Sequence, residues 1–215
     1  MRESVDIMPL EVLIASFLTV CLGCFFSENL HNILRVHKHN GQEEPYAEVG
    51  GPSGLIVSIA ALGTLLYFIE ACFYISATFS SIIISSPNVL PLSAQLPFLV
   101  YVQALGLAMT GTGYSLFVWS VIARGRYATS WEMRVNHKLV TWGPYRYMRH
   151  PSYLGYFLMF LGFIALWPNL ITLIPLAAIL GYIKATVQEE KLLEQRFGDE
   201  YREYKKRTGR FIPKF

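Results

Sequence analysis

Four long apolar runs constrain the fold of this 215-residue chain more than any other feature. They cover residues 9–26, 55–85, 96–123 and 153–183. A helix needs about 20 apolar residues to cross a membrane, so each of the first three runs predicts one span. The fourth run is interrupted by Trp167-Pro168-Asn169, and proline inside a helix removes a backbone hydrogen bond. We therefore expect an all-α membrane protein with about five transmembrane helices, the last two forming a short hairpin.

The distribution of charge supports this interpretation. Hydrophobic residues make up 53% of the chain and charged residues only 15%, against roughly 25% charged in a typical soluble domain. A soluble protein with buried helices is the alternative that this composition disfavours. Of the 18 Lys and Arg, two lie in 27–54, six in 124–152 and nine between Lys184 and Lys214. Five spans would place all three segments on one side, and the positive-inside rule assigns that side to the cytoplasm.

The length fits one integral-membrane domain, 1–215, with three spans in 1–123 followed by a more polar region, 124–215. We expect the first run to be a retained span rather than a cleaved signal peptide, because acidic residues dilute its leader. The membrane would be the endoplasmic reticulum in a eukaryote or the cell membrane in a prokaryote. The net charge of +3 then reflects contact with the lipid bilayer, and we expect no nucleic-acid partner.

Three features inside the apolar runs concern packing more than chemistry. Cys21 and Cys24 form C-x-x-C without a further ligand nearby, so we expect two small buried side chains and no metal site. Glu70 lies in the middle of the second run and should face the bundle interior or be protonated. It could serve a substrate or proton site, or simply join two helices. Small residues between Gly106 and Gly113 predict close helix packing.

The polar tail predicts a C-terminal amphipathic helical segment. Four residues at spacings of four, four and three share one face of a helix: Leu193, Phe197, Tyr201 and Tyr204. Gly198 and Asp199 interrupt this helix, and Asp199 could cap a second short one. The segment could lie on the membrane surface. Alternatively, it could turn Glu189 and Glu190 back towards the loop 124–152, which shares its side of the membrane.

The stretch GPYRYMRHPSYLG, residues 143–155, lies where the polar loop meets the fourth apolar run. Pro151 suits the first turn of a helix, because its missing N–H would have no partner there. The N–H groups of Ser152 and Tyr153 would then be free at a positive helix end, where a carboxylate or phosphate can bind. An interfacial belt would explain the Arg and Tyr residues alone. The paired prolines favour a defined loop with His150 at the helix cap.

Two segments resemble the isoprenylcysteine carboxyl methyltransferases, which are membrane enzymes related to the phospholipid methyltransferases. The segments are HKLVTWGPYRYMRHPSYLGY (137–156) and EEKLLEQRFGDEYREYKKRTGRFIP (189–213). The resemblance implies that 124–215 is the catalytic region and that S-adenosyl-L-methionine is the cofactor. It also implies a methyl acceptor that is a prenylated cysteine peptide or protein, methylated on its α-carboxylate, or another lipid.

The same resemblance assigns residues to roles. The residues that would line the cofactor pocket are His137, Lys138, Leu139, Val140, Tyr145, His150, Pro151, Ser152, Tyr153 and Glu189. Members of the family commonly have an arginine for the acceptor carboxylate where this chain has Ala185. Lys184 or Arg149 could replace it, and we expect these two and Glu190 to form the catalytic group.

Three other functions stay open. A phospholipid or other lipid methyltransferase would keep the cofactor and change the acceptor. Membrane sterol reductases share the fold and an R-H-P-x-Y-like element but use a nicotinamide cofactor, and their Y-G-x-x-W-like tail differs from FGDEY here. A non-catalytic transporter or lipid-binding scaffold would explain the spans but not the paired motifs.

Overall fold

Helices account for the regular structure of the computed structural model, which describes residues 9–40, 54–80, 98–127 and 138–214. Within these residues the α-helices are α1 (Pro9–Asn40), α2 (Gly54–Phe79), α3 (Leu99–Arg124), α4 (Pro151–Leu166) and α5 (Ala177–Arg207). Three short 3-10 helices join them: η1 (Gly125–Tyr127), η2 (Gly143–Arg146) and η3 (Ile171–Leu176).

Four of these helical stretches are long and apolar enough to cross a membrane, namely those in α1, α2, α3 and the η3–α5 unit. The fifth apolar helix, α4, is shorter, with 16 residues. The prediction of an all-α membrane protein is therefore confirmed. The first helix continues to Asn40, well past the end of the apolar run at residue 26. Residues 27–40 contain no glycine or proline, so nothing in the local sequence stops the helix.

The predicted hairpin forms at the proline-containing turn. Helix α4 ends before Trp167, and the side chain of Asn169 organises the return. The Asn169 Oδ1 atom accepts hydrogen bonds from the backbone N–H groups of Ile171 (2.9 Å) and Thr172 (3.1 Å). A side chain that accepts from the N–H groups just after it is the usual way to begin a helical turn. The chain therefore re-enters the bundle as η3 and then α5.

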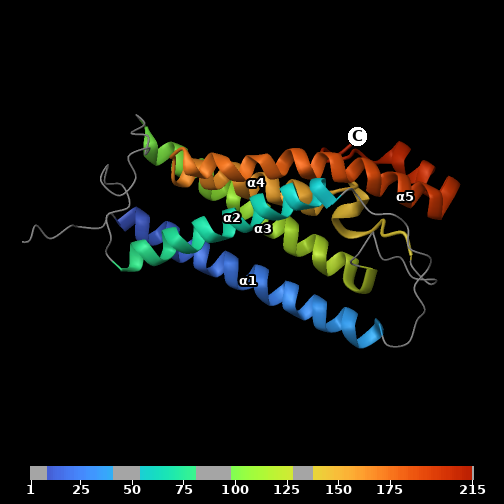
Figure 1. Cartoon of the computed structure of the whole chain (residues 1–215), viewed down its shortest axis with the longest axis horizontal. Helices are drawn as coiled ribbons and strands as arrows, with labels where there is room; N and C mark the ends of the chain where they lie inside the picture. Colours follow the sequence, from blue (N-terminus) through green and yellow to red (C-terminus); the bar gives the residue numbers. More distant parts are fainter. Residues whose placement is uncertain (1–8, 41–53, 81–97, 128–137, 215) are drawn as a thin grey trace, which may run out of the picture.

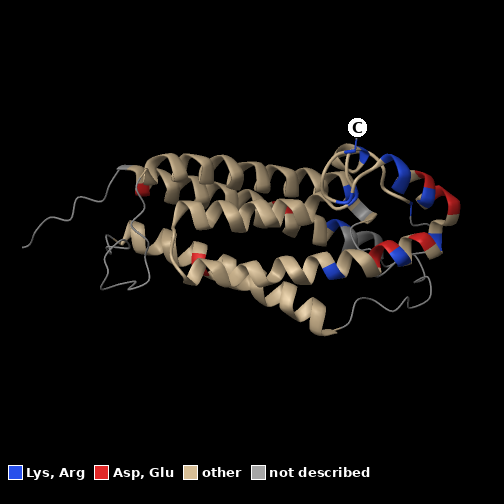
Figure 2. Cartoon of the chain, turned by 90° about the horizontal axis from the view of Figure 1, so that it is seen from above, with Lys and Arg blue, Asp and Glu red and all other residues tan. Residues whose placement is uncertain are grey.

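The helix ends that adjoin the three basic segments lie on one side of the bundle, as the charge distribution predicts. The last residues of α1, α3 and α5 and the first residues of α2 and α4 lie at the same end of the bundle (Figure 1). Lys and Arg residues of the described ranges gather towards this end, beside the C-terminus (Figure 2). Residues 86–95, which separate the second and third apolar runs, lie outside the described residues.

Glycines allow α3 and α4 to touch backbone to backbone, as the small residues of the third run predict. A Cβ atom on Gly113 would lie 2.7 Å from the carbonyl oxygen of Gly155, and one on Gly155 would lie 2.8 Å from the carbonyl oxygen of Gly113. About two turns further along α4, a Cβ atom on Gly162 would overlap the side chain and backbone of Thr110. Small residues allow this approach, which gains van der Waals contact in a membrane.

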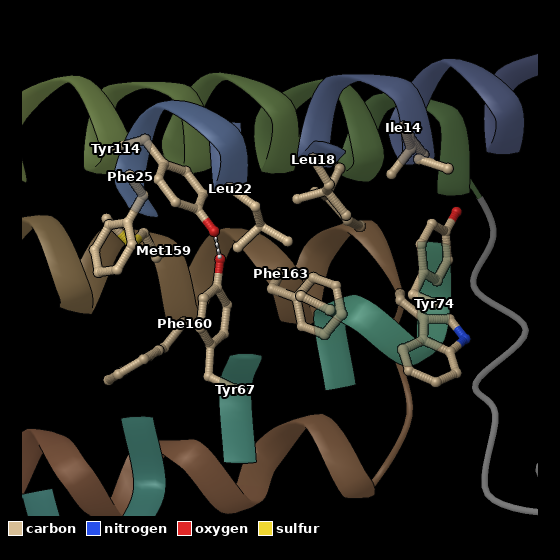
Figure 3. Close-up of a cluster of buried hydrophobic side chains, with 14 of the residues drawn as sticks. Ile14, Leu18, Leu22, Phe25, Tyr67, Tyr74, Tyr114, Met159, Phe160 and Phe163 are labelled. Atoms are coloured by element: carbon tan, nitrogen blue, oxygen red, sulfur yellow. Dashed lines mark hydrogen bonds between the residues drawn. The ribbon is translucent and has the colours of Figure 1, made fainter. Parts of the chain in front are cut away.

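The centre of the bundle is aromatic and contains a few polar groups. The hydroxyl groups of Tyr67 (α2) and Tyr114 (α3) lie 3.0 Å apart and point at each other beside Leu22 of α1 (Figure 3). Glu70 is buried, as expected for a carboxyl that faces the interior. The expectation of two buried cysteines is wrong for Cys24, which is exposed on α1, whereas Cys21 is half-buried.

Candidate functional site

The start of α4 forms the base of the candidate site. His150 is the residue that precedes the helix, and Pro151 occupies its first turn, as the sequence predicts. No side chain caps this end within the part of the chain that the structure describes. The N–H groups of Ser152 and Tyr153 have no partner inside the helix, because the first turn of any α-helix lacks acceptors. This end can therefore bind an anionic group.

The C-terminal segment, defined here as residues 208–213, pairs with the loop just before α4. The backbone N–H of Arg149 donates to the carbonyl of Gly209 (2.9 Å), and that of His150 donates to the carbonyl of Arg210 (3.0 Å). Met148 and Gly209 form an isolated parallel bridge. The ring of Phe211 lies 6.0 Å from that of His150 and 5.2 Å from that of Phe157, measured between centroids. The segment thus packs over the N-terminus of α4.

Helix α5 reaches the same loop because it bends at Gly198. This residue has a φ of 52° and a ψ of −122°, a conformation that favours glycine. The break falls on Gly198 itself, one residue before the predicted cap, and the carboxylate of Asp199 instead accepts from Arg202. Beyond the bend, Tyr201 and Tyr204 are buried.

The apolar face of this second part of α5 contacts the loop. Tyr201 and Tyr204 pack with Leu139 in a small cluster, which Leu193 and Phe197 flank. The Tyr204 hydroxyl donates to the backbone carbonyl of Tyr145 (2.7 Å). Of the two predicted arrangements of the tail, the structure therefore shows the one that folds back on the loop.

Glu189 and Glu190 point into the junction and take different partners. The Tyr153 hydroxyl donates to Glu189 Oε1 (2.5 Å), and the Nδ1 atom of His150 lies 3.5 Å from Glu189 Oε2. The rings of His150 and Tyr153 are stacked with centroids 5.6 Å apart. Arg149 Nε donates to Glu190 Oε1 (3.0 Å). Glu189 therefore faces the start of α4, whereas Glu190 faces the cations.

Glu190 is held by several positive groups at once. Arg210 donates from Nε (3.0 Å) and Nη2 (3.2 Å), and the Nζ atom of Lys205 lies 3.5 Å away. Burial alone would raise the pKa of the Glu190 carboxyl, but the nearby ring of His150 and the hydrogen bonds from Arg210 and Arg149 outweigh it and hold this pKa well below its usual range. Glu190 lies beyond the apolar part of α5, which ends at Ile183, and it stays ionised at any physiological pH.

This low pKa predicts how stability depends on pH. A carboxyl whose pKa is lower in the folded state stabilises the fold above its unfolded pKa, about 4.3 for Glu. The contribution is lost only as the pH falls through the lower, folded value. We expect Glu190→Gln to lower the free energy of unfolding by about 2 kcal/mol, the worth of hydrogen bonds to a charged group. The difference in Tm from the wild type should be equal at pH 7 and pH 5, and a difference that vanishes by pH 5 would contradict the assignment.

The structure brings most of the predicted site residues together at this end of the bundle. Those at the junction of α4, α5 and the loop are Tyr145, Arg149, His150, Pro151, Ser152, Tyr153, Glu189 and Glu190. Leu139 is buried beside them, Val140 is half-buried and Lys138 is exposed. Lys184 is exposed on α5 while its neighbour Ala185 is buried, so Lys184 does not join the cluster. His137 lies outside the described residues.

Sequence reasoning missed three residues of this region. The ring of Tyr182 packs at a tilt against that of Tyr153 and stacks on that of Tyr156, with centroids 4.6 Å and 5.2 Å apart. It precedes Glu189 by seven residues, two helical turns, and that spacing on one helix face could have revealed it. Arg210 was quoted within the tail motif but given no role. Arg124, at the end of α3, lies close enough for its charge to act on Tyr145 and Tyr153.

Chemically, the junction combines two complementary features. The positive end of α4 and the ring of His150 can hold an anionic group, while Glu189 can accept hydrogen bonds from a cationic or hydroxyl group. The Nε2 atom of His150 is buried, lies 3.3 Å from Glu190 Oε1 outside hydrogen-bond geometry, and has no hydrogen-bond partner among the described residues. Such an arrangement suits a small zwitterionic ligand at the rim of an apolar bundle.

Comparison with known proteins identifies relatives of this region. Residues 101–200 match the phospholipid methyltransferase family. The probable protein-S-isoprenylcysteine O-methyltransferase of Oryza sativa subsp. indica is 32% identical over 119 residues, which cover 53% of this chain and 62% of that protein. Protein-S-isoprenylcysteine O-methyltransferase B of Arabidopsis thaliana is 33% identical over 118 residues, 53% of this chain and 60% of that protein.

A third relative aligns over a shorter stretch. Protein-S-isoprenylcysteine O-methyltransferase of Schizosaccharomyces pombe is 38% identical over 80 residues, 36% of this chain and 34% of that protein. The aligned part of this chain thus spans about three fifths of the length of the rice and Arabidopsis relatives. These similarities confirm the resemblance inferred from the two motifs.

Proposed function

We propose that this chain, whose residues 101–200 match the phospholipid methyltransferase family, transfers a methyl group from S-adenosylmethionine to a lipophilic acceptor at the membrane. The observation that carries this proposal is the junction of the α4 start with the buried Glu189. It lies at the cation-rich end of the bundle, inside the region shared with methyltransferases. We assign catalysis to residues 124–215 and place this end in the cytoplasm, at the endoplasmic reticulum or the cell membrane.

The residues of the junction fit S-adenosylmethionine. Its amino-acid part is a zwitterion, and the start of α4 suits the carboxylate while Glu189 suits the ammonium group. The unsatisfied Nε2 atom of His150 marks a polar position that a ligand can occupy. Leu139, with Tyr201 and Tyr204 behind it, offers an apolar wall for the adenine. His137, Lys138 and Val140 would complete the pocket around it.

The acceptor that we propose is the α-carboxylate of a prenylated cysteine. S-adenosylmethionine supplies an electrophilic methyl group: as the new C–O bond forms, the S–CH₃ bond breaks and its electron pair stays on the sulfur. A free α-carboxyl group has a pKa of about 3.3–3.7, so at neutral pH it is already a nucleophile and needs no general base. The protein then contributes by holding the carboxylate in line with the methyl group. Helix α4 enters the apolar bundle directly from the junction, which suits an acceptor with a lipid chain.

A phospholipid amine is the second candidate acceptor, and one observation favours it. Of the two cations predicted to hold an acceptor carboxylate, Arg149 already binds Glu190 and the backbone carbonyls of Thr208 and Lys205. The other, Lys184, is exposed. An amine acceptor needs no cation in this position. Both candidates share the cofactor, so only a transfer assay separates them.

The purified protein should bind S-adenosylmethionine and not NADPH in a calorimetric titration. It should then transfer a radiolabelled methyl group to a farnesyl-cysteine derivative and not to the same compound without the farnesyl chain. Transfer to phosphatidylethanolamine alone would replace the prenylcysteine acceptor with a lipid amine. Equal transfer with and without the farnesyl chain would contradict a lipophilic acceptor. Binding of NADPH alone would assign the chain to the reductases, and binding of neither compound would refute the enzymatic proposal.

A further inference from the structure

Arg210 links three separate parts of the candidate site. Its guanidinium group donates two hydrogen bonds to Glu190 of α5, at 3.0 Å and 3.2 Å. Its backbone carbonyl accepts from the N–H of His150 in the loop, at 3.0 Å. The residue therefore ties the C-terminal segment 208–213 both to α5 and to the start of α4.

Arg149 closes the same set of contacts from the other side. Its backbone N–H donates to the carbonyl of Gly209, and its side chain donates to Glu190 and to the backbone carbonyl of Thr208. Hydrogen bonds thus join three elements: the loop, α5 and the C-terminal segment. An arginine fork can bridge a carboxylate with two parallel bonds, which fixes direction as well as distance.

Glu190 lies at the centre of these contacts. Its side chain is 3% exposed, and the groups around it are Arg149, His150, Lys205 and Arg210 of the chain itself. Glu189, one residue earlier, turns instead to Tyr153 and the other side of His150. The two carboxylates therefore have different partners: Glu189 faces the start of α4, and Glu190 contacts the C-terminal segment.

We propose that Arg210 is a positioning residue: by its pair with Glu190 it holds the C-terminal segment against the loop, and this keeps His150 and the first turn of α4 in place for the cofactor. The part that concerns the cofactor rests on the proposed function. The structural part is independent of the proposed function: Arg210 and Glu190 keep the N–H groups of Arg149 and His150 paired.

Gly209 offers a second way to disturb the same segment without changing its charge. A Cβ atom at this position would overlap the carbonyl oxygen of Ile212, because the chain turns back tightly between them. This turn places the ring of Phe211 against His150 and Phe157. Gly209→Ala should therefore shift the segment while it leaves the Arg210–Glu190 charges intact.

The test compares Arg210→Ala, Arg210→Lys and Gly209→Ala with Arg207→Ala as the matched control. Arg207 is exposed at the end of α5, and its side chain contacts only the backbone carbonyl of Glu203 among the hydrogen bonds of the described residues. Two kinds of measurement are made: hydrogen exchange of the Arg149 and His150 amides in the free protein, and titration and kinetics that give the affinity for S-adenosylmethionine and kcat at saturating cofactor. Size-exclusion chromatography and Tm show whether each variant is folded.

We expect Arg210→Ala and Gly209→Ala to speed exchange at both amides and to weaken cofactor binding about tenfold, with kcat at saturation changed by less than about threefold. Arg210→Lys should fall between them and the wild type, because lysine keeps the charge and loses the fork. Arg207→Ala should match the wild type in both measurements. Should Arg210→Ala prevent folding, Arg210→Lys and Gly209→Ala still give both readings.

Two results would overturn the inference. Unchanged exchange in the folded Arg210 variants would show that Arg210 does not hold the segment. Faster exchange with unchanged cofactor affinity would show that the segment does not position the site. A wild-type protein that binds no S-adenosylmethionine refutes the proposed function instead, and the exchange data still decide whether Arg210 holds the segment.

Discussion

Replacing Glu189 by Gln should weaken the binding of S-adenosylmethionine by about 10- to 100-fold. The side chains have nearly the same shape, so the change removes the charge and little else. Hydrogen bonds to a charged group contribute about 1.5–3 kcal/mol, and 1.4 kcal/mol corresponds to a factor of ten in affinity. Glu189 is buried between Tyr153 and His150, where water cannot replace the lost interaction. Isothermal titration calorimetry of the two proteins measures the difference directly.

Two further variants show whether the effect is specific to this carboxylate. Glu203→Gln removes an equal charge from an exposed position further along α5, where the side chain pairs with Lys206, and should leave the affinity unchanged. Tyr153→Phe removes the hydroxyl that donates to Glu189 and should weaken binding by less than Glu189→Gln does. If Glu189→Gln binds the cofactor as tightly as the wild type, Glu189 is not a cofactor ligand and the proposed pocket is wrong.

Gly162→Ala should cause a large loss of stability. The added Cβ atom would lie 2.7 Å from the backbone nitrogen of Thr110 and 2.9 Å from the carbonyl oxygen of Gly106. Backbone atoms cannot move aside as a flexible side chain can, so α3 and α4 must separate. Overpacking usually costs 1–3 kcal/mol, and we expect about 3 kcal/mol here. For a chain of this size that lowers Tm by about 6–12 °C in detergent.

Gly23→Ala is the matched control for this substitution. It also adds one methyl group to a glycine in an apolar helix, α1, but a Cβ atom at Gly23 meets no other atom within 4 Å. Alanine is a better helix former by about 1 kcal/mol, so Tm should stay equal or rise slightly. Equal Tm values for the two alanine variants would mean that α3 and α4 do not touch through Gly162.

Much of the fold could be predicted because the relevant signals are local. An apolar run of sufficient length must form a helix in a membrane, since every backbone polar group then finds its partner within the segment. Pro168 and Asn169 mark the hairpin, and Pro151 marks the start of α4, for equally local reasons. The length of α1 was underestimated because its polar end, 27–40, continues the helix outside the apolar run.

The sequence predicted which residues lie together at the site, but not which partners each of them contacts. The motifs place His150, Glu189 and Glu190 in one region, yet two neighbouring glutamates look alike in a sequence. They differ in the structure because adjacent residues on a helix point about 100° apart, so one faces α4 and the other faces the C-terminal segment. Lys184 and Ala185 show the same effect: the charge lies on the exposed side, and the buried position is apolar.

The sequence by itself determined the all-α membrane class, the hairpin, the helix start at Pro151 and the similarity to membrane methyltransferases. These depend on hydrophobicity, on helix-breaking residues and on motifs, all of which act over short stretches of chain. Only the tertiary structure decided that Arg210 meets Glu190, that Arg149 is occupied by both Glu190 and the C-terminal segment, and that Tyr182 packs against Tyr153. Such contacts join residues from different elements, and they arise when the bend at Gly198 and the glycines between α3 and α4 bring those elements within bonding distance.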